Sequence, residues 1–259
     1  MKAHIFNRIV LDTDNKSADF YLTKSPFCSS SLEPDLEKLK NWNFYDKFVP
    51  DRKTNIKAIT PQKALADTNI DYVDWFKTDS QGCDLRLFNA LGEKITNRII
   101  VADFEPGIID SYKGEDKLHT LMAYMEKTPF WVSDLKIEGS QRINRNIKGK
   151  YWNKMGRATQ EALNIVITSS PVCGEITYLN KLNNDKFSKR GYLLAWIFAI
   201  IKCQYGFALE IADTGSIRFG DNIFSELIQE TITLMEKEAK KKLIRQKIKK
   251  ALRKLKLRR

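Results

Sequence analysis

Residues 72–104 contain YVDWFKTD (72–79), SQG (80–82), CDLRLFNAL (83–91) and RIIVADF (98–104). The first and last segments are rich in β-branched and aromatic residues, SQG is typical of a tight turn, and the third segment has helical spacing. A strand, a helix and a second strand at this spacing form a crossover, which joins parallel strands. The stretch therefore predicts an α/β fold with a mainly parallel sheet, in which strands 72–79 and 98–104 are neighbours.

Weaker patterns on either side predict the remaining elements. Before this stretch we expect strands at 5–11, 20–23 and 56–59, and a helix with Thr60 as its N-cap and Pro61 at its first position. After it we expect a helix over 117–127, strands at 130–137, 163–168 and 175–179, an irregular segment at 144–160, and a buried helix within 189–211.

The composition is that of an ordinary globular protein, because 42% of the 259 residues are hydrophobic and 29% are charged. The four cysteines are widely separated, without the C-x-x-C spacing of a zinc site, and the first ten residues do not have the pattern of a signal peptide. This favours buried free thiols in a reducing, cytoplasmic compartment. The longest apolar run, Tyr192–Ile201, is too short to span a bilayer, which takes about 20 residues.

The positive charge is confined to the end of the chain. Residues 236–259 hold 13 Lys or Arg and 2 acids, a net of +11, whereas the preceding residues hold 31 and 30, a net of +1. Apolar residues recur at helical spacing along this tail and predict one apolar stripe on a helix of about 38 residues, roughly 57 Å long. They are Phe224, Leu227, Ile228, Ile232, Met235, Ala239, Leu243, Ile248, Leu252 and Leu255.

Three interpretations of the tail stay open at this point. The stripe packs on the body of the protein, or the helix lies on an anionic membrane surface, or it binds nucleic acid. Nucleic acid is the less favoured partner of the last two, because no aromatic residue in 236–259 is available to stack on bases.

Two acids stand where the central strands end. Asp79 follows the first strand and Glu105 follows the second. Because the carboxyl ends of parallel strands meet at one edge of the sheet, we expect both to face one cleft. Such a pair can orient a hydroxyl, accept its proton, or hold a divalent ion through oxygen ligands. The alternative is that both are solvated loop acids that cap the following elements.

Residues 73–88 resemble the D-x-x-K-x-D-x-E-G-x-E strand–turn–helix of FkbM-type S-adenosylmethionine-dependent methyltransferases. The strand end ADFEP (102–106) is similar to that family's next acidic strand end, and DFYLT (19–23) with SPFCSSSLEP (25–34) is similar to its upstream F-Y-x-T…S-S-L-x-x-P stretch. The resemblance extends more loosely through GEDKL (114–118) and GSQR (139–142) to about residue 179. Gln81 and Asp84 depart from it, since the commoner pattern has glutamates there.

The resemblance implies a partial Rossmann-like class I methyltransferase domain over residues 1–219, followed by a basic helical tail over 220–259. It implies methylation of a hydroxyl on a sugar, a glycan or another small metabolite. Asp79 and Glu105 are then the catalytic candidates, because Gln81 is no base. Gln81, Asp116 and Arg142 are the candidates for substrate binding, and no metal site is assigned. The alternatives are that Asp116 stabilises the start of the following helix and that Arg142 forms a surface ion pair.

The cofactor implied by the resemblance is S-adenosylmethionine, which such folds hold on a glycine-rich turn after the first strand. The first glycine of this chain is Gly82, so that turn is absent and the cofactor-binding residues stay unassigned. We therefore expect the methyltransferase domain to be N-terminally incomplete. The competing hypothesis is a non-enzymatic protein whose tail, 236–259, holds it peripherally at an anionic membrane or on nucleic acid.

Overall fold

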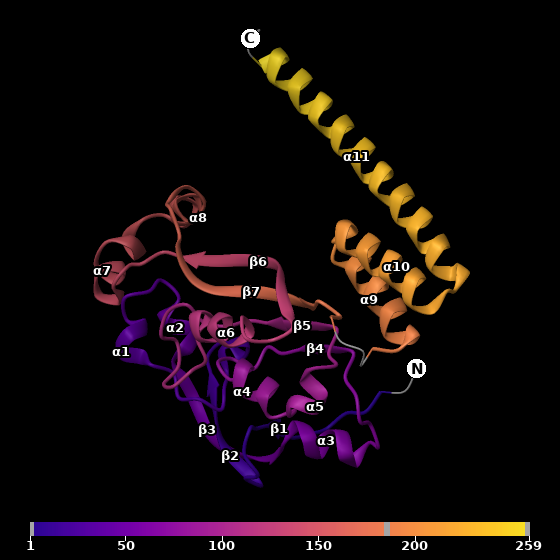
Figure 1. Cartoon of the computed structure of the whole chain (residues 1–259). Helices are drawn as coiled ribbons and strands as arrows, with labels where there is room; N and C mark the ends of the chain where they lie inside the picture. The colour runs from indigo at the N-terminus through magenta and orange to yellow at the C-terminus, as the bar shows by residue number, and fades with distance from the viewer. Residues whose placement is uncertain (1–2, 184–186, 257–259) are drawn as a thin grey trace. The chain divides into compact units, whose positions relative to one another are not determined.

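A computed structural model describes residues 3–183 and 187–256. The chain divides into two compact units between Lys181 and Leu182. The predicted boundary at 219/220 therefore falls inside the second unit, in which the basic helix packs with the two helices before it (Figure 1).

The first unit begins with a small three-stranded sheet. Its strands are β1 (Ile9–Val10), β2 (Ser17–Thr23) and β3 (Pro50–Ile59), in the order β1-β3-β2. β3 pairs with β1 in parallel and with β2 in antiparallel fashion. The predicted strand at 5–11 is reduced to two residues, whereas β2 and β3 extend into polar sequence that hydrophobicity alone does not reveal.

The second sheet is mixed and has the order β4-β5-β7-β6. β4 (Trp75–Lys77) and β5 (Val101–Phe104) are parallel neighbours, as the crossover predicted. However, β7 (Ser170–Asn180) is antiparallel to both β5 and β6 (Phe130–Ser140), so the prediction of a mainly parallel sheet is wrong. With one parallel pair and two antiparallel pairs, this sheet does not confirm the expected Rossmann-like fold.

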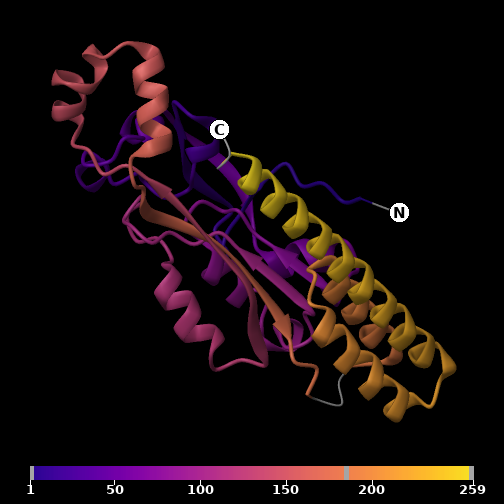
Figure 2. The same ribbon diagram turned by 90° about the horizontal axis from the view of Figure 1, so that it is seen from above.

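The antiparallel pairing of β6 and β7 follows from how they are connected. Between them lie α7 (Arg145–Lys150), the 3-10 helix η2 (Trp152–Lys154) and α8 (Arg157–Val166). Figures 1 and 2 show α7 and α8 beyond one end of the two strands, so the chain leaves and returns at the same end. A parallel pair needs a connection that crosses back over the sheet face.

α8 replaces the strand predicted at 163–168. β-branched residues at 165–168 suggested that strand, but the sequence from Arg157 favours a helix and includes an ion pair between Arg157 and Glu161 at 3.0 Å. The last two residues of α8, Ile165 and Val166, are 85% and 73% exposed.

α4 (Asp84–Asn89) and α6 (Leu118–Met125) cover one face of the second sheet, and α5 (Glu93–Thr96) follows α4. The core between helices and sheet is aromatic, and Phe88 meets Phe104 edge-on with 5.4 Å between the ring centroids. Leu121 and Met125 of α6 complete it at 0% exposure. This packing fixes the carboxyl ends of β4 and β5.

Short helices complete the first unit. They are a 3-10 helix η1 (Pro26–Cys28), α1 (Leu36–Leu39), α2 (Tyr45–Phe48) and α3 (Pro61–Asp67). The predicted start of α3 is confirmed, because the Thr60 side chain accepts a hydrogen bond from the Lys63 backbone N at 3.2 Å.

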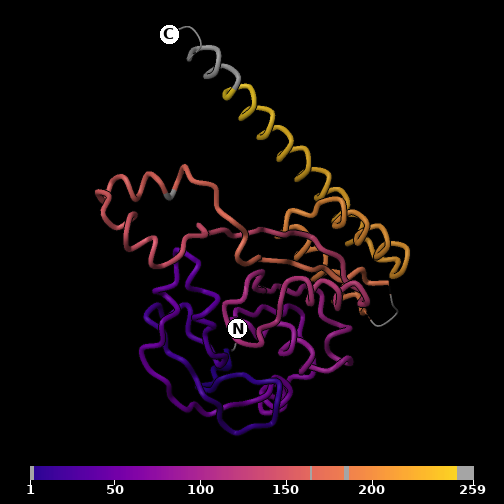
Figure 3. The backbone as a smooth tube through the Cα atoms, turned by 90° about the vertical axis from the view of Figure 1, so that its left-hand side faces the viewer, coloured from indigo at the N-terminus to yellow at the C-terminus, as the bar shows by residue number. Residues whose placement is uncertain are grey.

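The second unit consists of α9 (Lys189–Ile201), α10 (Tyr205–Phe219) and α11 (Asn222–Lys256). Gly220 ends α10 with a positive φ of 60°. The Trp196 indole N–H of α9 donates to the Thr231 hydroxyl of α11 at 2.8 Å. Figure 3 shows α11 continuing past the end of the α9–α10 pair. No helix within the described residues is long and apolar enough to cross a bilayer.

Candidate functional site

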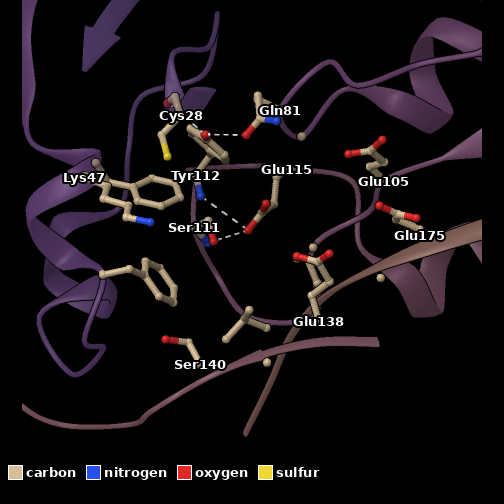
Figure 4. A pocket seen from close by; sticks show the side chains of 18 residues that line it. Cys28, Lys47, Gln81, Glu105, Ser111, Tyr112, Glu115, Glu138, Ser140 and Glu175 are labelled. Atoms are coloured by element: carbon tan, nitrogen blue, oxygen red, sulfur yellow. Dashed lines mark hydrogen bonds between the residues drawn. The ribbon is translucent and has the colours of Figure 1, made fainter. Parts of the chain in front are cut away.

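A cavity of about 340 Å³ lies in the first unit, beside the carboxyl ends of β4 and β5 (Figure 4). Its wall comes from the turns that follow these strands, from α2 and the residue before it, and from β6 and β7. The lining residues are Cys28, Phe44, Lys47, Phe48, Gln81, Gly82, Glu105, Gly107, Ser111, Tyr112, Glu115, Glu138, Gly139, Ser140, Val172, Cys173, Gly174 and Glu175.

The cavity is strongly acidic. Four segments each contribute one glutamate: Glu105 follows β5, Glu115 lies in the next loop, Glu138 is in β6 and Glu175 is in β7. Among the lining residues of the described chain, Lys47 is the one cation. Carboxylates accept hydrogen bonds and attract positive charge, so the cavity favours a ligand that carries hydroxyl or ammonium groups.

Glu105 is the predicted catalytic acid that this cavity contains. Its side chain is 30% exposed and accepts a hydrogen bond from the Lys77 ammonium at 3.0 Å. Burial raises the pKa of the Glu105 carboxyl, and the nearby Asp79 raises it further, although the hydrogen bond from Lys77 opposes them. A carboxylate with a raised pKa is a stronger base, which suits proton acceptance.

Asp84 fixes Glu105 in place. This carboxylate is 1% exposed and accepts hydrogen bonds from the Glu105 backbone N at 2.7 Å and the Ser80 backbone N at 3.1 Å. It also accepts from the hydroxyls of Thr78, at 3.2 Å, and Ser80. Asp84 therefore joins the end of β4 to the end of β5. The sequence showed it only as a departure from the family pattern, at the first position of the helix.

Gln81 connects the other predicted acid to the cavity. The Tyr112 hydroxyl donates to Gln81 Oε1 at 3.0 Å and lies 2.9 Å from the Cys28 carbonyl oxygen. Gln81 Nε2 donates to Asp79 Oδ1 at 2.5 Å. Burial raises the pKa of Tyr112, so its hydroxyl keeps its proton as a donor. Gln81 has a φ of 54°, a left-handed conformation that is uncommon outside sharp turns for residues other than glycine.

Asp79 itself faces a second cavity. This cavity, of about 330 Å³, is lined by Asp79 and Ser80 and also by Lys77 and Gln81. Gln81 thus borders both cavities, with Glu105 in the first and Asp79 in the second. The structure brings the three predicted residues Asp79, Gln81 and Glu105 to one sheet edge but does not direct both acids into one cavity.

Asp116 has a structural partner instead of a place in the cavity wall. Its carboxylate forms an ion pair with the Arg86 guanidinium at 2.9 Å and accepts from the Arg86 backbone N at 2.9 Å. The side chain is 14% exposed. Asp116 therefore binds the first turn of α4, and this contact was not predicted.

Arg142 is separate from the other predicted residues. It is exposed and follows the end of β6 at Ser140, and the cavity-lining residues of the described chain do not include it. The structure gives no support to a substrate role for Arg142 or Asp116 in this cavity.

Glu115 occupies the space that two glycines leave. A Cβ on Gly82 would lie 2.8 Å from Glu115 Cβ, and a Cβ on Gly107 would lie 2.7 Å from Glu115 Oε2. The Glu115 side chain is 2% exposed and accepts from the Ser111 backbone N at 2.5 Å and the Lys117 ammonium at 2.7 Å. Glu115 thus packs the backbone at both strand ends, a role that the sequence did not indicate.

The thiols of the cavity are poor nucleophiles. Burial, with Glu138 and Glu105 nearby, raises the pKa of Cys173 to about 11, and burial also raises the pKa of Cys28. All four cysteines are free thiols, but Cys83 is buried whereas Cys203 is exposed, so the expectation of four buried thiols is wrong. Within the residues that the structure describes, no group of three or more His, Cys, Asp or Glu side chains is arranged to hold a metal ion.

The cavity is therefore equipped for hydrogen bonding and for proton acceptance by Glu105 rather than for thiol chemistry. Phe44 and Phe48 add an apolar patch, with 5.5 Å between their ring centroids. Comparison with protein-family models, with curated proteins and with solved structures finds no match to this chain.

Proposed function

We propose that the first unit is an FkbM-type methyltransferase domain that methylates a hydroxyl of a sugar or another small polyhydroxylated metabolite. The observation that supports this most is the cavity beside β4 and β5, which four glutamates line. It lies on the strand ends within the segments that resemble the family, residues 73–88 and 102–106.

The lining suits a polyhydroxylated acceptor. Glu138 and Glu175 also line the cavity, with Glu175 beside Glu105, and present acceptor oxygens to ligand hydroxyls (Figure 4). Phe44 and Phe48 offer an apolar surface for the C–H face of a ring. A volume of about 340 Å³ is at the lower end of the range of small-molecule sites, roughly 300–1,000 Å³.

Glu105 is the proposed base. Methylation of a hydroxyl oxygen requires that the oxygen lose its proton, and Glu105 accepts that proton. Burial raises the pKa of Glu105, which strengthens it as a base, and its carboxylate accepts a hydrogen bond from the Lys77 ammonium at 3.0 Å. Asp84 is a positioning residue, because its hydrogen bond to the Glu105 backbone holds the base at the cavity.

The described residues do not fit S-adenosylmethionine as the resembling family holds it. That site needs bare glycine backbone close to the ligand. Gly82 and Gly107 follow the two parallel strands, but Glu115 fills the space beside each of them. The proposal therefore assigns the acceptor side of the reaction to this chain and assigns no residue to the methyl donor.

Two measurements on the full chain test the proposal. S-adenosylmethionine is titrated calorimetrically, and the formation of S-adenosylhomocysteine is followed by mass spectrometry with a panel of mono- and disaccharides. Glu105→Gln is expected to lower turnover about 100-fold or more, the usual effect of losing a general base. The matched control is Glu33→Gln, since Glu33 is half-exposed and pairs with Lys113 outside the cavity wall.

A folded chain that neither binds S-adenosylmethionine nor turns over any saccharide would reject the methyltransferase proposal. Turnover that Glu105→Gln leaves unchanged would keep the activity but reject Glu105 as the base.

A further inference from the structure

The distal segment of α11, residues 236–249, stands apart from the rest of its unit. Every residue of this segment is exposed, whereas Phe224 and Thr231 earlier in the same helix are 0% exposed. The sequence predicted one apolar stripe from Phe224 to Leu255. In the structure only its first part packs against the helices of the unit, and the part within 236–249 is exposed.

The distal segment exposes large aliphatic side chains. Leu243, Ile244 and Ile248 are 57%, 58% and 54% exposed. Ile244 and Ile248 are one helical turn apart and share a face of α11. In the sequence Leu252 follows Ile248 by four residues and Leu255 follows Leu252 by three. Neighbouring isoleucines that are exposed to water on a long helix indicate a binding surface for a protein or a membrane.

Basic side chains stand beside and between these aliphatic residues, and Lys241 lies one turn before Ile244 on the same face. The distal segment contains seven Lys or Arg residues and two acids. Both acids already pair within the helix, Glu236 with Lys240 at 3.8 Å and Glu238 with Lys241 at 2.5 Å. Exposed aliphatic side chains among many basic ones suit the interface of an anionic bilayer, where acyl chains take up the first and headgroups attract the second.

We infer that the distal segment of α11 is a docking surface for an anionic lipid membrane. The helix lies in the plane of the membrane, with Ile244 and Ile248 among the acyl chains and the ammonium and guanidinium groups at the headgroups. Each Lys or Arg near such a surface strengthens partitioning about fivefold.

Two other occupants fit the segment less well. A second copy of the chain would bring two equally basic helices together, and their charges repel. A nucleic acid would contact the basic side chains but leave Ile244 and Ile248 in water, since phosphate binding uses no aliphatic surface. The lipid surface is the occupant that uses both the charge and the aliphatic face.

The test is sedimentation of the full chain with vesicles. We expect binding to phosphatidylcholine vesicles that contain about 30% phosphatidylserine, weaker binding at high salt, and none to pure phosphatidylcholine. The double variant Ile244→Gln/Ile248→Gln keeps the net charge, and both sites are exposed, so the fold is retained. It is expected to weaken partitioning about 30-fold.

The matched control is Ile165→Gln/Ile217→Gln, which makes the same chemical change at sites that are 85% and 81% exposed. This control is expected to bind vesicles as the natural sequence does.

Three results would overturn the inference. The first is a folded chain that fails to bind the phosphatidylserine vesicles. The second is binding to duplex RNA, but not to vesicles, that Ile244→Gln/Ile248→Gln leaves unchanged. The third is a concentration-dependent dimer that this double variant abolishes while vesicle binding persists.

Discussion

Replacing Asp84 by Asn tests whether one buried carboxylate holds the site together. One carboxylate oxygen becomes an NH₂ group. In the natural sequence the Glu105 backbone N–H donates to Asp84 Oδ2 at 2.7 Å. In the less costly orientation of the asparagine, its NH₂ group takes the place of Oδ2 and faces this N–H. That hydrogen bond to a charged group contributes about 2 kcal/mol, and leaving its donor buried without an acceptor adds about 1 kcal/mol. We therefore expect a loss of about 3 kcal/mol in local stability.

Native-state hydrogen exchange measures this loss where it occurs. A change of about 3 kcal/mol corresponds to about 150-fold less protection of the Glu105 amide. The matched control is Asp79→Asn, which makes the same chemical change at an exposed side chain and is expected to cost less than about 0.5 kcal/mol. If the hydrogen-exchange protection of the Glu105 amide falls by less than about threefold in Asp84→Asn, the Asp84 carboxylate does not join the two strand ends.

Two further predictions concern the second unit and the thiols. In Gly215→Ala the new methyl group overlaps the Phe224 ring, so thermal unfolding should show a loss of about 1–3 kcal/mol in the second unit. Gly206→Ala, in the same helix with nothing within 4 Å of the added Cβ, should be neutral or slightly stabilising, and equal losses in both variants would contradict the packing argument. Alkylation by iodoacetamide should label the exposed Cys203 first at pH 8, while labelling of Cys173, with a pKa of about 11, should rise about tenfold for each pH unit up to pH 10. Peptide mass spectrometry follows both sites, and fast labelling of Cys173 in the folded chain at pH 8 would contradict a raised pKa.

The parallel pair of β4 and β5 was predictable because its determinants are local. One strand, a turn at Gln81-Gly82, one helix and the next strand follow each other without interruption, and a crossover of this length has one favoured outcome. The same local pattern placed Asp79, Gln81 and Glu105 at one sheet edge.

The orientation of β6 and β7 was not predictable in this way. It depends on where the intervening helices pack, which no local pattern reports. Because Glu138 and Glu175 belong to these strands, their place in the cavity was missed together with the topology. Glu115 was missed for another reason, since its role depends on the space beside two glycines.

The segment that connects β6 to β7 and contains α7 and α8 has a consequence for how this unit can change in evolution. Because it departs and rejoins at one end of the strands, its length is independent of their register. It also braces the segment before α2, since the Asn43 backbone N donates to the Gln141 carbonyl at 3.0 Å and Lys148 donates to the Asn43 carbonyl at 2.8 Å. The next residue, Phe44, belongs to the cavity wall. Insertions and deletions in 145–166 can thus change the shape of this cavity wall while the sheet and Glu105 keep their positions.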